Sequence, residues 1–211
     1  MMGGLVLSVI IATITVVNCL VVGLPCAYCI ARRQFRGKEL LLNFLSLPML
    51  IPEVVIGISL LMFFTRALLY DSLTKILLAH FLFTFPYMLR ALTATLVGYD
   101  KSAEEAALVL GANQIQAFAS VVFPLIRAGV IGGSIFAFFI SFDNTAVTLF
   151  LADPFTRTLP VALFVRLKSY SDPVIAAAST LLIALSYLII ILLEKTVGLD
   201  KFTGIAPLPG R

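Results

Sequence analysis

Residues 102–124 read SAEEAALVLGANQIQAFASVVFP and form a polar interruption in an otherwise very apolar chain. Ser102 and Glu105 match a capping box, in which each side chain accepts a hydrogen bond from the backbone N–H of the other residue. We therefore expect a helix that begins near Ala103. The permissive backbone of Gly111 is expected to end it.

Asn113 follows this glycine and is a suitable cap for a second short helix, which we expect to reach about Val122. The small side chains of Ala106 and Ala107 allow the backbone of a partner to come close. The stretch thus predicts a compact helix–turn–helix. A rigid element of this kind transmits a displacement that a floppy loop dissipates. The alternative is an amphipathic loop that rests on lipid headgroups.

The composition indicates an integral membrane protein. Hydrophobic residues make up 61% of the 211 residues, charged residues make up 12%, and the mean hydropathy is +1.09. A water-soluble domain of this length needs far more polar surface. The net charge of +4 is modest and suggests no role in nucleic-acid binding.

A membrane-spanning helix needs roughly 20 mainly apolar residues. Continuous rather than alternating apolar runs indicate helices and not a β-barrel. We therefore predict an all-α membrane protein with one transmembrane domain over residues 1–211 and a cytoplasmic loop at 99–127. The expected spans are 3–31, 40–65, 76–98, 128–151 and 173–193.

Lysine and arginine residues set the expected orientation, because they favour the cytoplasmic side. The densest basic cluster follows the first span and comprises Arg32, Arg33, Arg36 and Lys38. Placing this cluster inside also places the 99–127 loop inside. The same topology leaves Met1 outside.

The spacing E-A-A-x3-G-x9-V-x-F-P, from Glu105 to Pro124, closely resembles the EAA loop of permease subunits in binding-protein-dependent ABC importers. Segments 31–37 (ARRQFRG) and 47–57 (LPMLIPEVVIG) resemble further motifs of these permeases. Segments 141–144 (SFDN) and 158–160 (TLP) look most like the subclass that imports putrescine and spermidine. The resemblance implies the type I (MetI-like) permease bundle in the inner membrane, which usually has a sixth span at the N-terminus. A genuine five-span permease is the alternative.

In that family the EAA loop docks on the ATP-binding subunit as a coupling helix. The resemblance therefore implies an ATPase-coupling site at Glu105, Ala106, Ala107 and Gly111, with Ser102 as the expected cap. It also implies a pair of ATPase subunits, a second permease subunit, an extracytoplasmic binding protein and the lipid bilayer as partners. The implied cargo is a polyamine-like cation.

Three polar residues fall inside the expected spans. Glu53 follows Pro48 and Pro52, while Asp143 and Asn144 lie in the outer half of the fourth expected span. An ionisable residue in a membrane is costly and usually faces protein or a water path. The three residues are candidates for an acidic translocation path. The alternative is a structural hydrogen-bond cluster between helices.

His80 is the only histidine, and its aromatic surroundings favour a helix-packing role over a proton relay. Gly129 and Gly133 form a G-x-x-x-G pattern, which allows two helices to approach closely. Packing is its expected meaning, and an interface with a second permease subunit is a further use of it in this fold.

The chain lacks the phosphate-binding loop G-x-x-x-x-G-K-[ST], so we expect it to bind no ATP by itself. No metal-ligand cluster, cofactor motif or nucleophile with its base is present in the sequence, and we expect no enzyme activity. Alternatives remain for the function. They are an ABC permease for iron, an amino acid or a similar solute, an ATPase-independent carrier that uses Glu53, His80 and Asp143, and a remnant that no longer transports.

Overall fold

The computed structural model of the chain describes residues 2–169 and the separate positions 177, 180, 183, 184, 187, 188 and 191. Every regular element in this part of the chain is helical, which confirms the all-α class. The span expected at 173–193 lies outside the described residues, apart from those positions. The elements are α1 (Met2–Arg32), α2 (Lys38–Ser46), η1 (Leu47–Leu50), α3 (Glu53–Arg66), α4 (Ser72–Val97), α5 (Ser102–Val109), α6 (Gln114–Ala117), η2 (Phe118–Val122), α7 (Phe123–Asp143), α8 (Ala146–Leu151) and α9 (Leu159–Ser169).

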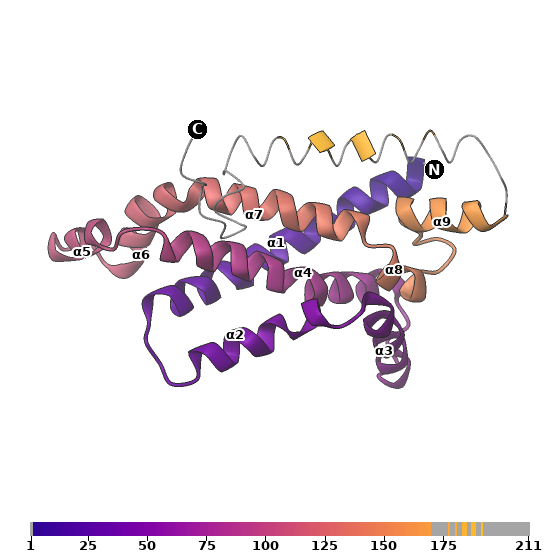
Figure 1. Cartoon of the computed structure of the whole chain (residues 1–211), viewed down its shortest axis with the longest axis horizontal. Coiled ribbons are helices and arrows are strands. Elements are labelled where there is room, and N and C mark those ends of the chain that lie inside the picture. Colours follow the sequence, from indigo (N-terminus) through magenta and orange to yellow (C-terminus); the bar gives the residue numbers. More distant parts are fainter. Residues whose placement is uncertain are drawn as a thin grey trace, which may run out of the picture.

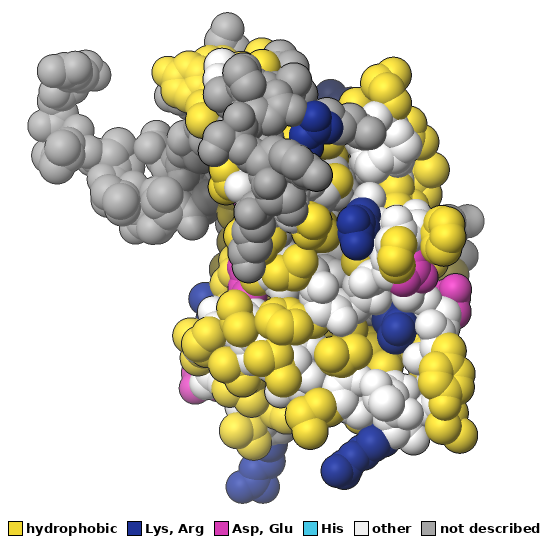
Figure 2. Space-filling model, turned by 90° about the vertical axis from the view of Figure 1, so that its right-hand side faces the viewer, with side chains coloured by type: hydrophobic (Ala, Val, Ile, Leu, Met, Phe, Trp, Pro, Cys, Tyr) yellow, Lys and Arg dark blue, Asp and Glu magenta, His cyan; other side chains and the backbone are white. Residues whose placement is uncertain are grey.

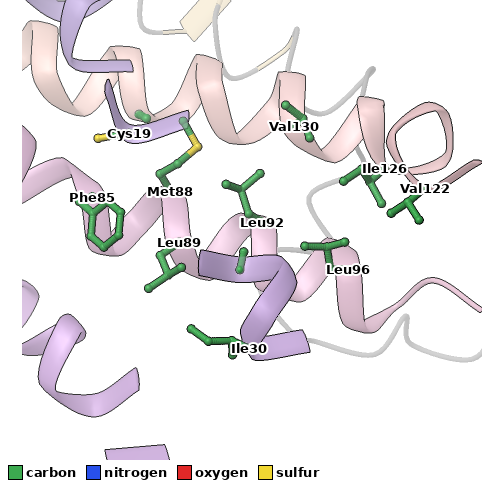
Figure 3. Packing of buried hydrophobic residues seen from close by; sticks show 12 residues of the cluster. Cys19, Ile30, Phe85, Met88, Leu89, Leu92, Leu96, Val122, Ile126 and Val130 are labelled. Atoms are coloured by element: carbon green, nitrogen blue, oxygen red, sulfur yellow. The ribbon is translucent and has the colours of Figure 1, made fainter. Parts of the chain in front are cut away.

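The long helices α1, α4 and α7 lie side by side and form the body of the molecule (Figure 1). Their shared core is built from apolar side chains of all three helices and η2 (Figure 3), among them Cys19, Ile30, Met88, Leu92, Leu96, Val122, Ile126 and Val130. In Figure 3 the labelled side chains of α4, from Phe85 to Leu96, run through the middle of the cluster, and α4 contacts both α1 and α7. α4 is therefore the central helix of the body.

Close contact between α4 and α7 depends on the two glycines of the G-x-x-x-G pattern. A Cβ atom added to Gly129 would lie 2.2 Å from Oγ1 of Thr95, and one added to Gly133 would lie 3.2 Å from Cβ of Ala91. Both glycines thus face α4 of the same chain. The expected packing role is confirmed, and this contact lies within the subunit.

The outer surface of the body is apolar. Within the described residues, α1, α4 and the continuous helical run Gln114–Asp143 are each long and apolar enough to cross a membrane. Most side chains of α1 are nevertheless outside the core, including exposed valines and isoleucines. Figure 2, an end-on view from the side of α3, α8 and α9, also shows apolar side chains over much of the described surface. Such a surface fits a lipid environment.

The span expected at 40–65 is broken in the structure. The segments Lys38–Leu50 and Glu53–Arg66 meet at an angle of 98°. Pro52 precedes α3 and disfavours helical geometry at Ile51, whose φ of −92° and ψ of 132° are extended. Counted as one span, this bent pair brings the described candidates to four. The prolines predict a bend in this span, and the structure makes it a helical corner of 98°.

The span expected at 128–151 also differs. Its helix α7 begins at Phe123 and ends at Asp143, and after a break at Asn144 and Thr145 the chain continues as α8. A second apolar cluster packs α8 against α3 and α4, with Ile56, Phe64, Ile76 and Val147 among its buried members. The break places polar residues next to the corner between η1 and α3.

Candidate functional site

The helices α5 and α6, with the turn between them, project from one end of the body, opposite the end that carries α3, α8 and α9 (Figure 1). We call this segment, Ser102–Ala117, the helical stub. It matches the predicted helix–turn–helix. Its two helices are short, so their geometry depends on how each end is capped.

The turn between the helices has the expected chemistry. Gly111 adopts a φ of +95°, and the N–H groups of Gly111 and Ala112 donate to the carbonyls of Leu108 and Ala107, at 3.1 Å each. This pattern is a Schellman motif, which satisfies the last carbonyls of α5. The helix therefore ends where the sequence predicts.

Asn113 caps α6 as expected. Its side-chain oxygen accepts from the N–H of Gln116 at 2.9 Å, while the Gln116 side-chain oxygen accepts from the N–H of Asn113 at 3.0 Å. The result is a complete capping box at the start of the second helix. π-helical geometry at Phe118–Val122 then leads directly into α7. The stub is thus continuous with a long helix of the body.

The capping box expected at Ser102 and Glu105 is absent, and that prediction is wrong. α5 has no side-chain cap at its N-cap residue, Lys101. Instead, the Ser102 hydroxyl and N–H donate to the two carboxylate oxygens of Asp100, at 2.6 Å and 3.1 Å. These bonds hold the pKa of Asp100 below its usual range. The carboxylate of Asp100 is a strong acceptor near the positive end of the helix and binds Ser102, while the N–H of Glu105 donates to the carbonyl of Lys101 at 3.0 Å.

The predicted coupling residues lie together on the stub. Ser102, Glu105, Ala106 and Gly111 are exposed, and Ala107 is half-buried. The tip is apolar as well as exposed, with exposed fractions of 87% at Val109, 88% at Leu110 and 80% at Ile115. This combination gives a rigid, partly apolar surface at the end of the body.

Glu104, directly before the E-A-A triplet, points the other way and is buried. It accepts a hydrogen bond from the Tyr28 hydroxyl, and its Oε2 lies 2.9 Å from Nε of Arg32. The Arg32 guanidinium lies over the ring of Tyr99, 4.7 Å from the ring centre. These four residues form a polar cluster between α1 and α5, which we call the Glu104 cluster.

Sequence reasoning missed the Glu104 cluster. The available signal was the four-residue spacing of Tyr28 and Arg32, which puts both on one face of α1. Nothing in that spacing identifies the acidic partner, because Glu104 is distant in the sequence and a neighbour of the equally acidic Glu105. Only the packing of the three long helices brings these residues together.

Two of the three expected path residues are in direct contact. Asn144 is buried in the break between α7 and α8, and its side-chain nitrogen donates to Oε2 of Glu53 at 3.4 Å. Its side-chain oxygen accepts from the N–H of Val147 at 3.2 Å and so caps α8. Asp143 is exposed and lies near enough to Glu53 for their charges to repel. The structure thus places these two carboxylates near the α7–α8 break.

A hollow of about 530 Å³ opens beside this break. Its lining is mainly apolar and comes from α3, α8 and α9, with Asp143 as the charged residue of the lining. A second groove, of about 560 Å³, is lined by α2, η1, α4 and α7 and carries Arg90, whose Nε donates to Oγ of Ser46 at 3.2 Å. The two openings therefore differ in the sign of their charge.

His80 is buried between α4, α7 and α8, where it makes two hydrogen bonds of 2.8 Å, to Ser141 and Thr148. The Thr148 hydroxyl donates to the carbonyl of Asn144 at 2.7 Å, so it can only accept from His80. A neutral His80 therefore carries its proton at Nε2 and accepts from Ser141 at Nδ1. Both ring nitrogens are satisfied, which is the expected packing role.

The fold and the stub together define a class, namely an all-α membrane protein with a helical hairpin at one end of its bundle. The family model described as "binding-protein-dependent transport system inner membrane component" matches residues 19–197. The chain belongs to this family. The predicted resemblance and the predicted inner-membrane location are both confirmed.

Curated relatives include the spermidine/putrescine transport system permease protein PotC of Haemophilus influenzae, which is 31% identical over 185 residues, 88% of this chain and 72% of that protein. The putrescine transport system permease protein PotI of Escherichia coli is 30% identical over 190 residues, 87% and 68% of the two chains. The molybdate/tungstate transport system permease protein WtpB of Pyrococcus abyssi is 28% identical over 194 residues, 92% and 77% of the two chains. The chain is thus a permease component of an importer and not itself an enzyme.

Proposed function

We propose that this permease is driven by an ATPase pair that docks on the helical stub, and that it conducts a polyamine-like cation delivered by an extracytoplasmic binding protein. A second permease subunit, identical or similar, completes the path. The single observation that supports the docking site best is the exposed apolar tip of a rigid stub. Apolar side chains this exposed at a bundle end favour a protein partner.

Energy transfer through the stub has a physical basis. α5 ends in a Schellman motif and α6 begins with a capping box. α6 then runs through η2 into α7, so a push on the stub meets a continuous helical element. Glu105 and Ala106 lie on the exposed side, where a groove in the ATPase would receive them. In this proposal, closure of the ATPase pair on ATP moves the stub and switches the bundle between inward- and outward-facing states.

The cargo proposal depends on charge and on the relatives. Asp143 lines the hollow at the α7–α8 break, and Glu53 contacts Asn144 in that break; carboxyl groups at this place favour a cation over an oxyanion such as molybdate. Two relatives carry polyamine names and one carries an oxyanion name. The acidic residues support the cation as the proposed cargo.

Uptake into proteoliposomes tests both proposals. The chain is reconstituted with its second permease, ATPase pair and binding protein, and the uptake of labelled spermidine, putrescine and molybdate is compared. We expect ATP-dependent uptake of a polyamine and none of molybdate. Molybdate uptake would refute the cargo, and uptake without the ATPase would refute the energy source and favour an independent carrier.

Glu105→Lys tests the docking surface in the same vesicles. We expect it to abolish transport while the bundle itself stays folded, because Glu105 is exposed and supports no buried contact. Glu39→Gln, at an exposed position of α2, is the control and should transport normally. Normal transport by Glu105→Lys would contradict the coupling role.

A further inference from the structure

We propose that Glu104 is the internal anchor of the coupling helix α5, which ties the stub to the C-terminal end of α1 through Arg32. This inference rests on the proposed function and adds a second route for the movement of the stub. Glu105 and Ala106 receive the ATPase on the outer face, and Glu104 passes the displacement to α1 on the inner face. Two adjacent glutamates thus serve opposite faces of one helix.

The burial of the pair supports an anchor. The side chains of Arg32 and Glu104 are 10% and 9% exposed. Removing one partner of such a pair leaves the other charge buried and uncompensated, which costs more than the intact pair contributes. The pair therefore resists separation, and α1 and α5 are expected to move together at this point.

The neighbours of the pair make the contact specific. Tyr28 donates its hydroxyl to Glu104, while its ring packs edge-on against Phe118 of η2, with 5.3 Å between ring centres. Tyr99 receives the guanidinium of Arg32 on its face. The cluster thus connects α1, α5 and η2, the elements that a moving stub has to carry with it.

The backbone contacts of α5 show why a side-chain anchor is needed. α5 packs mainly against α6 and η2, and both of these lead into α7. Without Glu104, a displacement of α5 would be transmitted to α7 but only weakly to α1. α1 contacts both α4 and α7, so the anchor couples the stub to all three long helices of the body.

One feature of Arg32 fits an anchor that rearranges. Its Nη2 is buried and makes no hydrogen bond within the described residues, and its Nε meets Oε2 of Glu104 as an ion pair without hydrogen-bond geometry. A guanidinium has five N–H donors in a planar fork. Arg32 thus retains donor capacity for Glu104 when α5 shifts, and the pair can persist through the movement.

The test measures transport and ATP hydrolysis together in proteoliposomes that contain the complete importer. For Glu104→Gln we expect the ATPase pair to stay bound and hydrolysis to continue, while the solute transported per ATP falls by at least about fivefold. Arg32→Gln should give the same fall in solute transported per ATP as Glu104→Gln. The double variant should show no larger fall than either single variant, because the two residues act as one unit. Glu39→Gln should keep the wild-type ratio.

Three results would overturn the anchor. The first is a wild-type ratio of solute transported per ATP in Glu104→Gln. The second is loss of the bound ATPase from Glu104→Gln, which would put Glu104 in the docking surface. The third is additive losses of this ratio in the double variant. If Glu104→Gln does not assemble, Tyr28→Phe removes only one hydroxyl from the same cluster. A wild-type ratio there would also refute the anchor. Failure of wild-type protein to bind any ATPase would refute the proposed function instead.

Discussion

Gly111 turns the chain between the two helices of the stub with a φ of +95°, a conformation that costs other residues about 1–2 kcal/mol. Nothing lies within 4 Å of the place that its Cβ would occupy, so the cost comes from the backbone and not from a clash. We expect Gly111→Val to distort the stub and to lower ATP-driven uptake by at least about fivefold.

Gly98→Ala is the matched control for this prediction. Gly98 also follows a helix, but its φ is −74° and an added Cβ makes only ordinary contacts. The Gly98→Ala variant should therefore transport solute as the wild type does. Equal uptake by Gly111→Val and Gly98→Ala would show that the turn is not part of the coupling element.

At the same scale, the sequence predicted those site features that depend on near neighbours. Gly111 and Asn113 were predictable because turn and cap chemistry acts over a few residues. Ser102 was assigned wrongly because two acceptors, Asp100 and Ser102, compete for the same helix start. Glu104 was not predictable, since its partners on α1 are distant in sequence.

At the scale of the elements, a chain of hydrogen bonds through Ser141, His80, Thr148 and Asn144 stabilises the break between α7 and α8. Thr148 joins the break to His80 of α4, and it is fully buried. Thr148→Val keeps the shape but leaves the Nε2–H of His80 without an acceptor. We expect this change to destabilise the protein by about 1–3 kcal/mol, seen as a lower melting temperature in detergent.

Thr13→Val is the control for this substitution. Thr13 bonds only to a carbonyl of its own helix, at an exposed position of α1, so its loss should change the melting temperature little. If Thr148→Val and Thr13→Val have the same melting temperature, the His80 network does not stabilise the break. In that case His80 would be open to the relay role that an independent carrier requires.

The contact between α4 and α7 gives a second prediction for the elements. A methyl group at Gly129 would meet the side chain of Thr95 at 2.2 Å, so Gly129→Ala should cost about 1–3 kcal/mol through overpacking. Gly3→Ala, where nothing lies within 4 Å, should be neutral. Thermal melting of the two purified variants measures the difference, and equal melting would contradict the close packing.

The long helices α1, α4 and α7 were predictable because long apolar runs have few alternatives in a membrane. The corner at Ile51 and Pro52 was less predictable from the sequence. The prolines indicate a bend in the sequence, but a bent span and a corner of 98° have the same composition. What decides between them is the packing of α3 against α8, which no local pattern contains.

For the molecule as a whole, the chemistry is divided between two ends. One end carries the stub and the Glu104 cluster, and the other carries α3, α8 and α9 (Figure 1). Between them, α1, α4 and α7 share the apolar core cluster shown in Figure 3. We therefore propose that energy enters at the stub and reaches the acidic residues at the α7–α8 break through this body.

A photo-crosslinking residue tests the entry of energy at the stub most directly. It is placed at Leu110 on the tip of the stub or, as the control, at Phe155 in the opposite end, positions that are 88% and 93% exposed. The assembled importer is then irradiated in its membrane. We predict a crosslink from position 110 to the ATPase subunit and none from position 155. Absence of the ATPase crosslink at position 110, or equal crosslinks at both positions, would contradict the entry of energy through the stub.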